Sequence, residues 1–406
     1  MSDQGNQKSL PRGSYIPTAL NRYCLNGDAF IMIEDAYTIC TDGKRPYRVF
    51  EGDLAEQVRL GKVHREGRRL YLTKTWRYEN AAATHLSAIL RDNTAVCPEL
   101  SADLFRVGEM CLNEEQCGAV RMALSHRLSV ILGGAGTGKS TIIKKIVDEY
   151  PTVGFVLAAP TGKAARNLSD CAGYQARTVH SALGLHLDDD ALSPVIWKHI
   201  GLVVVDEASM VTIELLAGLL CKVRKDCRIV LVGDPNQLLS VGLGNVLPDI
   251  LALGIPCIRL EQNFRQADKE TALYRNVVGF ADLNDESELC FDDSFRMEVM
   301  GELAVEKALV EEAVRRYQSG ESVQVLSPYN SRTQLSVRAL NRSLQERLNP
   351  AVPCKKELVV DGEVFRDGDR VIITRNDHDR HCVNGDVGIL RIEDDDTESP
   401  VYYVRD

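Results

Sequence analysis

The sequence has no long apolar run, no paired cysteines and no leader-like start. In its 406 residues, no apolar run approaches the roughly 18 residues of a membrane span, so we expect no membrane partner. The N-terminus is polar and lacks the apolar core of a signal peptide. The twelve cysteines are scattered singly with no C-x-x-C spacing. This dispersion is typical of reduced thiols in a cytoplasmic protein and argues against a disulfide framework.

Two further features limit the possible ligands. His378, His381 and Cys382 cluster near the C-terminus, but no second ligand pair has matching spacing, so a solvated turn is the better interpretation than a metal site. The formal net charge is −10, which does not indicate nucleic-acid binding. It does not exclude such binding either, because the charge of a local groove matters more than the net charge of the chain.

The most informative feature is a glycine-rich loop between an apolar run, Leu128–Leu132, and a second apolar segment, Thr141–Val147. It matches G-x-x-x-x-G-K-[ST] in strand–loop–helix context, which predicts a phosphate-binding loop. Backbone N–H groups and the helix N-terminus attract the phosphates there. The residues predicted to bind the nucleotide are Gly133, Gly134, Ala135, Gly136, Thr137, Gly138, Lys139, Ser140 and Thr141. Lys139 is expected to reach the β- and γ-phosphates, and Ser140 to hold Mg²⁺.

A second site supports the first. The apolar run Val203–Val205 ends in Asp206 and Glu207. Ligands of parallel α/β sheets bind at the carboxyl ends of the strands. We therefore expect Asp206 to hold Mg²⁺ and Glu207 to act as the general base toward water. Gln237 follows another apolar strand and is placed to touch the γ-phosphate or the attacking water.

Strands and helices alternate from Leu112 to about Phe264, which predicts a doubly wound parallel sheet of the P-loop, RecA-like type. We expect four domains: an α+β module over 1–108, a first RecA-like domain with the phosphate loop over 109–264, a partial second RecA-like domain over 265–352 and a small β-barrel over 353–406. Within the first of these, Leu54–Leu72 is a candidate winged helix. Within the third, we predict a helix over Glu302–Gln318 and a strand over Val323–Leu326.

Seven segments in order resemble the RecD-like branch of the superfamily 1 DNA helicases, over about residue 69 to the end. They are Leu112–Gln116, the phosphate loop, Ala159–Ala165, Thr178–His180, Asp206–Ser209, Gly233–Leu238 and Leu260–Gln266. The resemblance implies an ATP- and Mg²⁺-dependent helicase that moves 5′ to 3′ on single-stranded DNA. It places Gln116 at the adenine, and it places both Gln237 and Arg265 at the γ-phosphate. It places Pro160, Thr161, Lys163 and His180 on the DNA track. The end of the chain looks like the family's inserted barrel, similar to a Src-homology-3 fold.

The resemblance also implies missing parts. After its barrel, the family supplies a threonine–histidine–lysine–glutamine-type DNA motif and a last motif with a second arginine, and neither occurs before Asp406. We therefore expect a helicase truncated at its C-terminus, incomplete as a motor alone, and a protein partner that completes the second motor domain.

Two other functions stay open. One is a non-motor regulator that binds nucleotide and DNA as a switch or decoy. The other is a different phosphate-loop enzyme, such as a kinase or GTPase. The sequence has no guanine-specifying N-K-x-D, and the adjacent Asp206–Glu207 pair fits an ATPase better.

Overall fold

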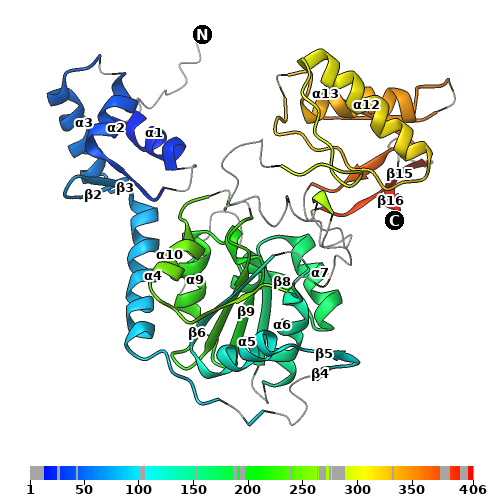
Figure 1. Ribbon diagram of the computed structural model, residues 1–406. Helices are drawn as coiled ribbons and strands as arrows, with labels where there is room; N and C mark the ends of the chain where they lie inside the picture. The colour runs from blue at the N-terminus through cyan, green and yellow to red at the C-terminus, as the bar shows by residue number, and fades with distance from the viewer. Residues whose placement is uncertain are drawn as a thin grey trace. The chain divides into compact units, whose positions relative to one another are not determined.

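A computed structural model gives the fold of the chain (Figure 1). It describes residues 13–24, 28–42, 44–97, 99–100, 106–134, 136–150, 154–185, 190–192, 197–237, 240, 242–262, 264, 271–273, 276, 289–331, 333–353, 355–374, 385–393 and 401–405. Backbone contacts divide the chain into two compact units, Met1–Ala267 and Asp268–Asp406.

The first unit begins with a small α+β module. Its elements are α1 (Tyr15–Cys24), β1 (Phe30–Met32), α2 (Ile33–Thr41), α3 (Tyr47–Arg59), β2 (Val63–Glu66) and β3 (Arg69–Leu72). The strands form an antiparallel sheet in the order β1-β3-β2. Fully buried Ile16, Phe50, Leu54 and Leu70 come from both helices and sheet, so the module has a core of its own.

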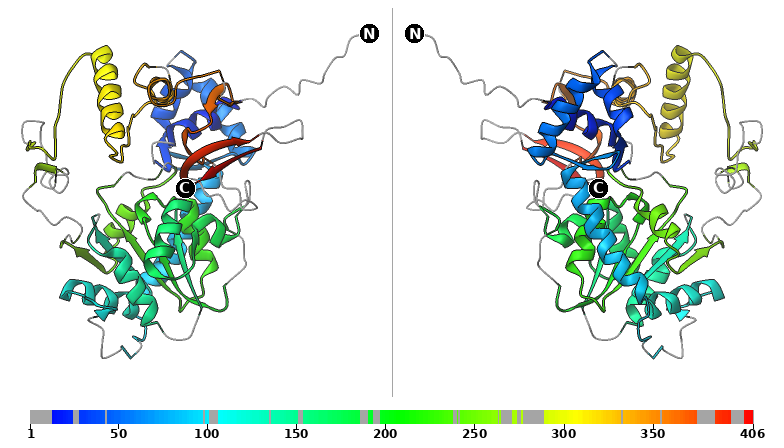
Figure 2. Two further views of the ribbon diagram at one scale, coloured as in Figure 1. Left: turned by 90° about the vertical axis from the view of Figure 1, so that its right-hand side faces the viewer. Right: turned by 90° about the vertical axis from the view of Figure 1, so that its left-hand side faces the viewer.

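Helix α4 (Thr73–Arg91) starts directly after β3 and runs along the parallel-sheet domain of the same unit (Figures 1 and 2). Its buried stripe of Tyr78, Ala82, Leu86 and Ile89 belongs to the core that covers one face of that sheet. The Tyr78 hydroxyl donates to Glu214 at 2.8 Å, so α4 is fixed to the sheet domain although it lies within the range predicted for the N-terminal module.

Six parallel strands form the main sheet, in the order β11-β6-β10-β9-β7-β8. Their bounds are β6 (Leu128–Gly133), β7 (Gly154–Ala159), β8 (Ala176–Thr178), β9 (Ile200–Val205), β10 (Arg228–Gly233) and β11 (Cys257–Leu260). β6, β9 and β10 are buried almost throughout, as continuous apolar strands of a sheet covered on both faces should be. The prediction of a doubly wound parallel sheet is confirmed. The three-residue β8 is too short to show a period in the sequence.

Helices cover both faces of this sheet (Figure 1). One face packs against α5 (Glu114–Ser125), α6 (Lys139–Asp148) and α7 (Gly162–Ala172). The other packs against α4, α8 (Val179–Leu183), α9 (Ile213–Lys222) and α10 (Val246–Ala252). A short 3₁₀ turn, η1 (Ala208–Met210), follows β9, and the small hairpin of β4 (Arg106–Val107) and β5 (Met110–Cys111) precedes α5. All six carboxyl ends therefore meet at one edge, which is where polar side chains can gather.

The second unit holds two helices, α12 (Glu302–Gln318) and α13 (Val337–Leu348), and five strands among its described residues. The strands are β12 (Glu357–Val360), β13 (Glu363–Arg366), β14 (Arg370–Ile372), β15 (Val387–Glu393) and β16 (Val401–Arg405), paired as β12-β13 and β14-β15-β16. Asp361 and Gly362, which join β12 to β13, have φ values of 50° and 80°. Two positive φ angles are what a two-residue hairpin turn of this kind requires, and an Asp-Gly pair adopts them readily.

The predicted strand over Val323–Leu326 is wrong. These residues form no ladder within the described part of the chain, and 80% of Leu326 is exposed. An apolar segment becomes a strand only where a neighbouring strand pairs with it. No described strand of the second unit lies parallel to another, so the segment stays extended beside α12 and α13.

No described helix has the length and apolar character to cross a membrane. No described group of three His, Cys, Asp or Glu residues could hold a metal ion. His378, His381 and Cys382 lie outside the described residues.

Candidate nucleotide-binding site

The start of α6 is built to attract an anion. Helices α5, α7, α8 and α9 each begin with a side chain that caps the helix, namely Asn113, Thr161, Thr178 and Thr212. The N-cap residue of α6 is Gly138, which has no side chain that could cap the helix. Its first N–H groups are therefore left for a ligand, at the positive end of the helix dipole. This is the geometry of a phosphate site.

Glycine is required at several positions of the loop before α6. Gly136 and Gly138 both have φ of 83°, a left-handed conformation that disfavours other residues. A Cβ at Gly138 would lie 2.6 Å from Nε2 of Gln116, and one at Gly133 would lie 2.4 Å from Oγ1 of Thr137. Larger residues at these positions would close the loop. Ala135 lies outside the described residues.

Lys139 is folded back onto its own loop. Its ammonium donates to the carbonyl oxygens of Gly133 at 2.6 Å and Gly134 at 3.0 Å. These carbonyls are neutral acceptors, and phosphate oxygens are stronger acceptors for a cation. The lysine is thus held at the loop, in place to exchange carbonyl contacts for phosphate contacts.

Asp206 lies beside this loop and is deeply buried. Burial raises its pKa to about 6, while a hydrogen bond from the Glu207 N–H and the charge of Lys139 act in the opposite direction. Lys139 follows β6 and Asp206 follows β9, so the two residues lie at the same edge of the sheet with only β10 between their strands. A buried carboxylate that faces a phosphate loop fits a Mg²⁺ ligand, together with the hydroxyl of Ser140.

Glu207 has an unusual backbone conformation. Its φ of 52° and ψ of 42° are left-handed, which is uncommon outside glycine, asparagine and aspartate. Its Oε2 is buried with no hydrogen-bond partner among the described residues. Strain and an unpaired carboxylate oxygen at a strand end are features that persist at functional sites. The sequence identified the residue but gave no signal of the backbone conformation.

Gln237 follows β10, the strand that lies between β6 and β9. Its N–H donates to the Asp234 carbonyl at 3.2 Å, which fixes the turn after the strand. A Cβ at Gly134 would lie 3.9 Å from Oδ2 of Asp234, so this turn adjoins the phosphate loop. The strand order therefore brings Lys139, Gln237 and the Asp206–Glu207 pair to one edge. Asp234, missed in the sequence, joins them.

Gln116 is buried, and both ends of its amide are engaged. Its Oε1 accepts from the Asn113 N–H at 3.0 Å and its Nε2 donates to the Thr137 carbonyl at 3.3 Å. With the Asn113 side chain capping the Gln116 N–H, this is a capping box. The N-x-x-Q spacing could have predicted it. The contact with adenine stays a prediction, for which one amide N–H is left.

The segment after β11 is attached to the same loop. The Phe264 N–H donates to the Gly136 carbonyl at 2.7 Å, and the Asn113 amide donates to Gln262 at 3.0 Å. These bonds connect the seventh predicted motif to the phosphate loop and to α5. Arg265 lies outside the described residues, so its role stays a prediction.

The residues predicted for the DNA track lie at two adjacent helix starts. Ala159 pairs with Thr178 at the ends of β7 and β8, so the starts of α7 and α8 are neighbours. Pro160 is half-buried there, while Thr161, Lys163 and His180 are exposed. The Thr161 hydroxyl oxygen accepts from the Ala164 N–H, which leaves its O–H free to donate to a phosphate.

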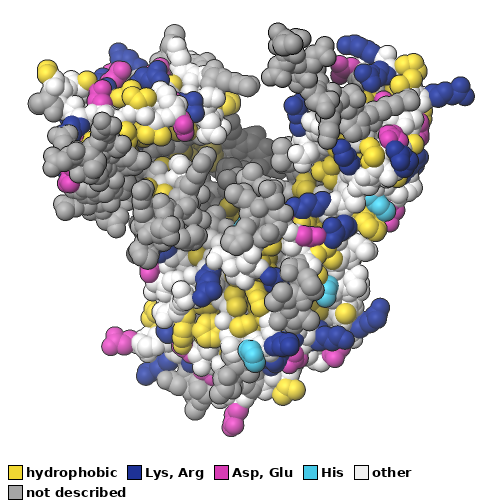
Figure 3. Space-filling model, turned by 180° about the vertical axis from the view of Figure 1, so that it is seen from behind, with side chains coloured by type: hydrophobic (Ala, Val, Ile, Leu, Met, Phe, Trp, Pro, Cys, Tyr) yellow, Lys and Arg dark blue, Asp and Glu magenta, His cyan; other side chains and the backbone are white. Residues whose placement is uncertain are grey.

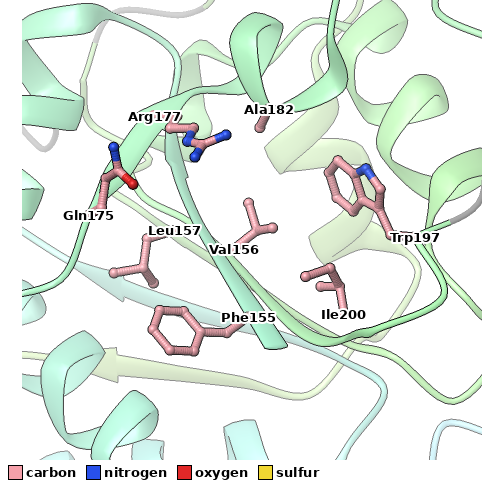
Figure 4. Close-up of a pocket in the computed structure, with 8 residues that line it drawn as sticks. All are labelled: Phe155, Val156, Leu157, Gln175, Arg177, Ala182, Trp197 and Ile200. Carbon is pink, nitrogen blue, oxygen red and sulfur yellow. The ribbon is translucent and has the colours of Figure 1, made fainter. Parts of the chain in front are cut away.

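The cavity in Figure 4 is a different place. It has a volume of about 430 Å³, and the polar side chains of Arg177 and Gln175 are part of its lining. Its other described lining residues are Phe155, Val156, Leu157, Ala182, Trp197 and Ile200. The lining residues on β7 and β9, namely Phe155, Val156, Leu157 and Ile200, precede the carboxyl ends of those strands. The cavity is therefore not the phosphate site.

The carboxylate of Asp206 gives a stability prediction. Because burial raises its folded pKa above the unfolded value, the unliganded protein should lose stability as pH rises from about 4 to about 6. Asp206→Asn keeps the acceptor for the Glu207 N–H and removes the charge. In EDTA, the free energy of unfolding of this variant should exceed that of the wild type by about 1–3 kcal/mol at pH 7.5 and should equal it near pH 4. Urea denaturation measures this, and a gain that is the same at both pH values would contradict the assignment.

The sheet order, the phosphate loop and the acidic strand end define a P-loop nucleotide-binding domain of RecA-like fold. Residues 111–280 match the family model described as "AAA domain", and residues 340–405 match that described as "ATP-dependent RecD-like DNA helicase SH3 domain". Together with the fold, these matches support a RecD-like superfamily 1 helicase, with an SH3-like domain over residues 340–405.

Curated relatives agree with this assignment. The chain is 35% identical over 286 residues to the "ATP-dependent RecD2 DNA helicase" of Deinococcus radiodurans, which covers 69% of this chain and 38% of that protein. It is 35% identical over 219 residues to the "RecBCD enzyme subunit RecD" of Mycolicibacterium smegmatis, covering 46% of this chain and 38% of that one. The chain thus spans well under half of these relatives. Among solved structures, Bacteroides Pif1 bound to ssDNA covers 73% of this chain and 74% of its own at 18% identity, with a TM-score of 0.41.

Proposed function

We propose that this chain is the ATP- and DNA-binding part of a RecD-type helicase, which hydrolyses ATP as it moves 5′ to 3′ along single-stranded DNA. The observation that carries this proposal is the shared edge of the sheet. Lys139, Asp206, Glu207 and Gln237 gather there, a few residues from the exposed helix starts that suit DNA phosphates. ATP hydrolysis at the sheet edge can therefore alter the contacts that the helix starts make with the DNA backbone.

Each residue has a role in the proposal. The free N–H groups of α6 and the Lys139 ammonium bind the β- and γ-phosphates. Ser140 and Asp206 hold Mg²⁺, which when bound neutralises charge on the phosphate oxygens. Glu207 takes a proton from the attacking water, and Gln237 orients that water. Gln116 contacts the base, Arg265 reaches the γ-phosphate, and Pro160, Thr161, Lys163 and His180 track the DNA.

The test is ATP hydrolysis with and without single-stranded DNA. We expect oligo-dT to stimulate hydrolysis, and Lys163→Ala with His180→Ala to raise the DNA concentration that gives half-maximal stimulation by about tenfold. A strand-displacement assay with 5′ and 3′ tails tests the direction. Hydrolysis that does not respond to DNA would contradict the proposal.

A non-motor, nucleotide- and DNA-binding regulator remains the second candidate. It is favoured by one observation, the lack of a parallel sheet among the described residues of the second unit. Mixing separates the two functions. A protein partner that completes the second motor domain should restore translocation upon addition, whereas a regulator should bind DNA and inhibit an intact helicase.

A further inference from the structure

The α+β module at the start of the first unit has no part in the proposed ATPase. Its element order, α1-β1-α2-α3-β2-β3, with an antiparallel sheet that ends in the β2–β3 hairpin, is that of a winged helix. In this arrangement α3 is the third helix and the hairpin, which turns at Gly67 with φ of 60°, is the wing. We name the outward face of α3 together with the hairpin the α3–wing surface.

Helix α3 has two distinct faces. Phe50, Asp53, Leu54 and Gln57 are buried on the side toward the module's core. On the opposite side, at helical spacing, the residues are exposed, and they are Arg48, Gly52, Ala55 and Arg59. Nothing in the core requires this outward face, and it carries two arginines at its ends.

The α3–wing surface is basic in an acidic chain. Residues 44–69 hold eight lysines and arginines against four carboxylates, a net charge of +4, whereas the whole chain has −10. Lysine and arginine side chains stand out on this module, at the upper right of Figure 3. A local concentration of positive charge on one face is the electrostatic footprint of a nucleic-acid site.

Three of the four carboxylates in this segment have close partners, and the fourth, Glu66 on the wing, accepts from the Tyr71 hydroxyl at 3.5 Å. Glu51 lies 3.2 Å from Arg65, Glu56 lies 2.7 Å from Arg59, and buried Asp53 accepts from Tyr15 at 2.9 Å. Arg48 and Lys62 have no ion pair among the described residues. Arg48 near the start of α3 and Lys62 just past its end are thus positive groups that remain available for phosphates.

We propose that the α3–wing surface binds the backbone of duplex DNA. Duplex is favoured over single strands because single-strand sites stack bases on exposed aromatic rings. The exposed aromatic on α3 is Tyr47, whose hydroxyl bonds to Glu51 and whose ring packs edge-on against Tyr37. A convex helix with a basic hairpin beside it matches a groove and its flanking phosphates.

The experiment measures anisotropy of a labelled blunt duplex of about two helical turns with the full chain, without nucleotide. Excess unlabelled oligo-dT keeps the single-strand track occupied. Arg48→Gln with Lys62→Gln should weaken duplex binding about tenfold and reduce the slope of log K against log salt by about 2. The matched control, Arg22→Gln with Lys225→Gln, removes the same charge from exposed positions elsewhere in the unit and should leave both values unchanged.

A second variant tests the surface without removing a cation. Ala55→Glu adds a carboxylate at the exposed middle of α3, where it is compatible with a helix, and should also weaken duplex binding. Thermal unfolding of each variant checks the fold. Equal losses in the test and control pairs, or no loss in either α3 variant, would overturn the proposal. An equal loss for labelled oligo-dT would also overturn it, because the surface would then belong to a single-strand site. DNA-stimulated ATP hydrolysis should persist in all variants, so this proposal and the proposed function can fail separately.

Discussion

Replacing Lys139 with alanine should weaken Mg²⁺-ATP binding by at least about 100-fold. The ammonium now donates two hydrogen bonds to the carbonyls of Gly133 and Gly134, and in the bound state it would donate them to phosphate. Hydrogen bonds to charged groups contribute about 1.5–3 kcal/mol each, and about 3 kcal/mol corresponds to a 100-fold loss. Isothermal titration with a non-hydrolysed ATP analogue measures the change.

Lys144→Ala is the matched control for Lys139→Ala. Lys144 is one turn further along α6, where it forms an ion pair with Asp148 at 3.3 Å on a partly exposed face. Its loss should cost a few tenths of a kcal/mol in stability and leave nucleotide affinity unchanged. The free N–H groups of α6 remain in both variants, so weak residual phosphate binding is expected in Lys139→Ala. An unaltered nucleotide affinity in Lys139→Ala would contradict the assignment of the phosphate site to the start of α6.

Much of the parallel-sheet domain could be predicted because its signals are local. Buried strands such as Val203–Val205 show as continuous apolar runs, and each ends where a polar residue follows. The glycine loop before Lys139 has a spacing set by phosphate geometry, which survives in a single sequence. Helix α12 matches its predicted bounds because its apolar positions repeat along one face.

What could not be predicted depends on partners in space. Val323–Leu326 has strand composition, yet its state is decided by whether another strand pairs with it. The first turns of α4 bury Thr75 and Tyr78, which are not aliphatic, so the buried stripe that continues through Leu86 does not show there as an apolar period. The left-handed backbone of Glu207 follows from how β9 enters η1, and no sequence pattern reports such strain. Asp234 adjoins the phosphate loop only because β10 inserts between β6 and β9.

Glu207→Gln should separate nucleotide binding from hydrolysis. The carboxylate lies next to the Mg²⁺ ligand Asp206, and its Oε2 has no partner among the described residues, so it is free to accept a proton from water. Glutamine keeps the size and the backbone N–H that bonds to Asp206, and it removes the basic oxygen. DNA-stimulated ATP hydrolysis should fall about 10²- to 10⁴-fold, the usual contribution of a general base, while ATP affinity changes less than about threefold.

Two comparisons make the Glu207 result specific. Asp170→Asn removes a carboxylate from an exposed position on α7 and should leave the rate of hydrolysis unchanged. Asp206→Asn should lose Mg²⁺-dependent nucleotide affinity, whereas Glu207→Gln should retain it. Single-turnover hydrolysis with ATP bound in advance measures the chemical step directly. If Glu207→Gln hydrolysed ATP at the wild-type rate, the base would have to be another group. If it lost Mg²⁺-dependent affinity as Asp206→Asn does, Glu207 would be assigned to the metal site, because its contribution would then be made in the ground state and not only in the chemical step.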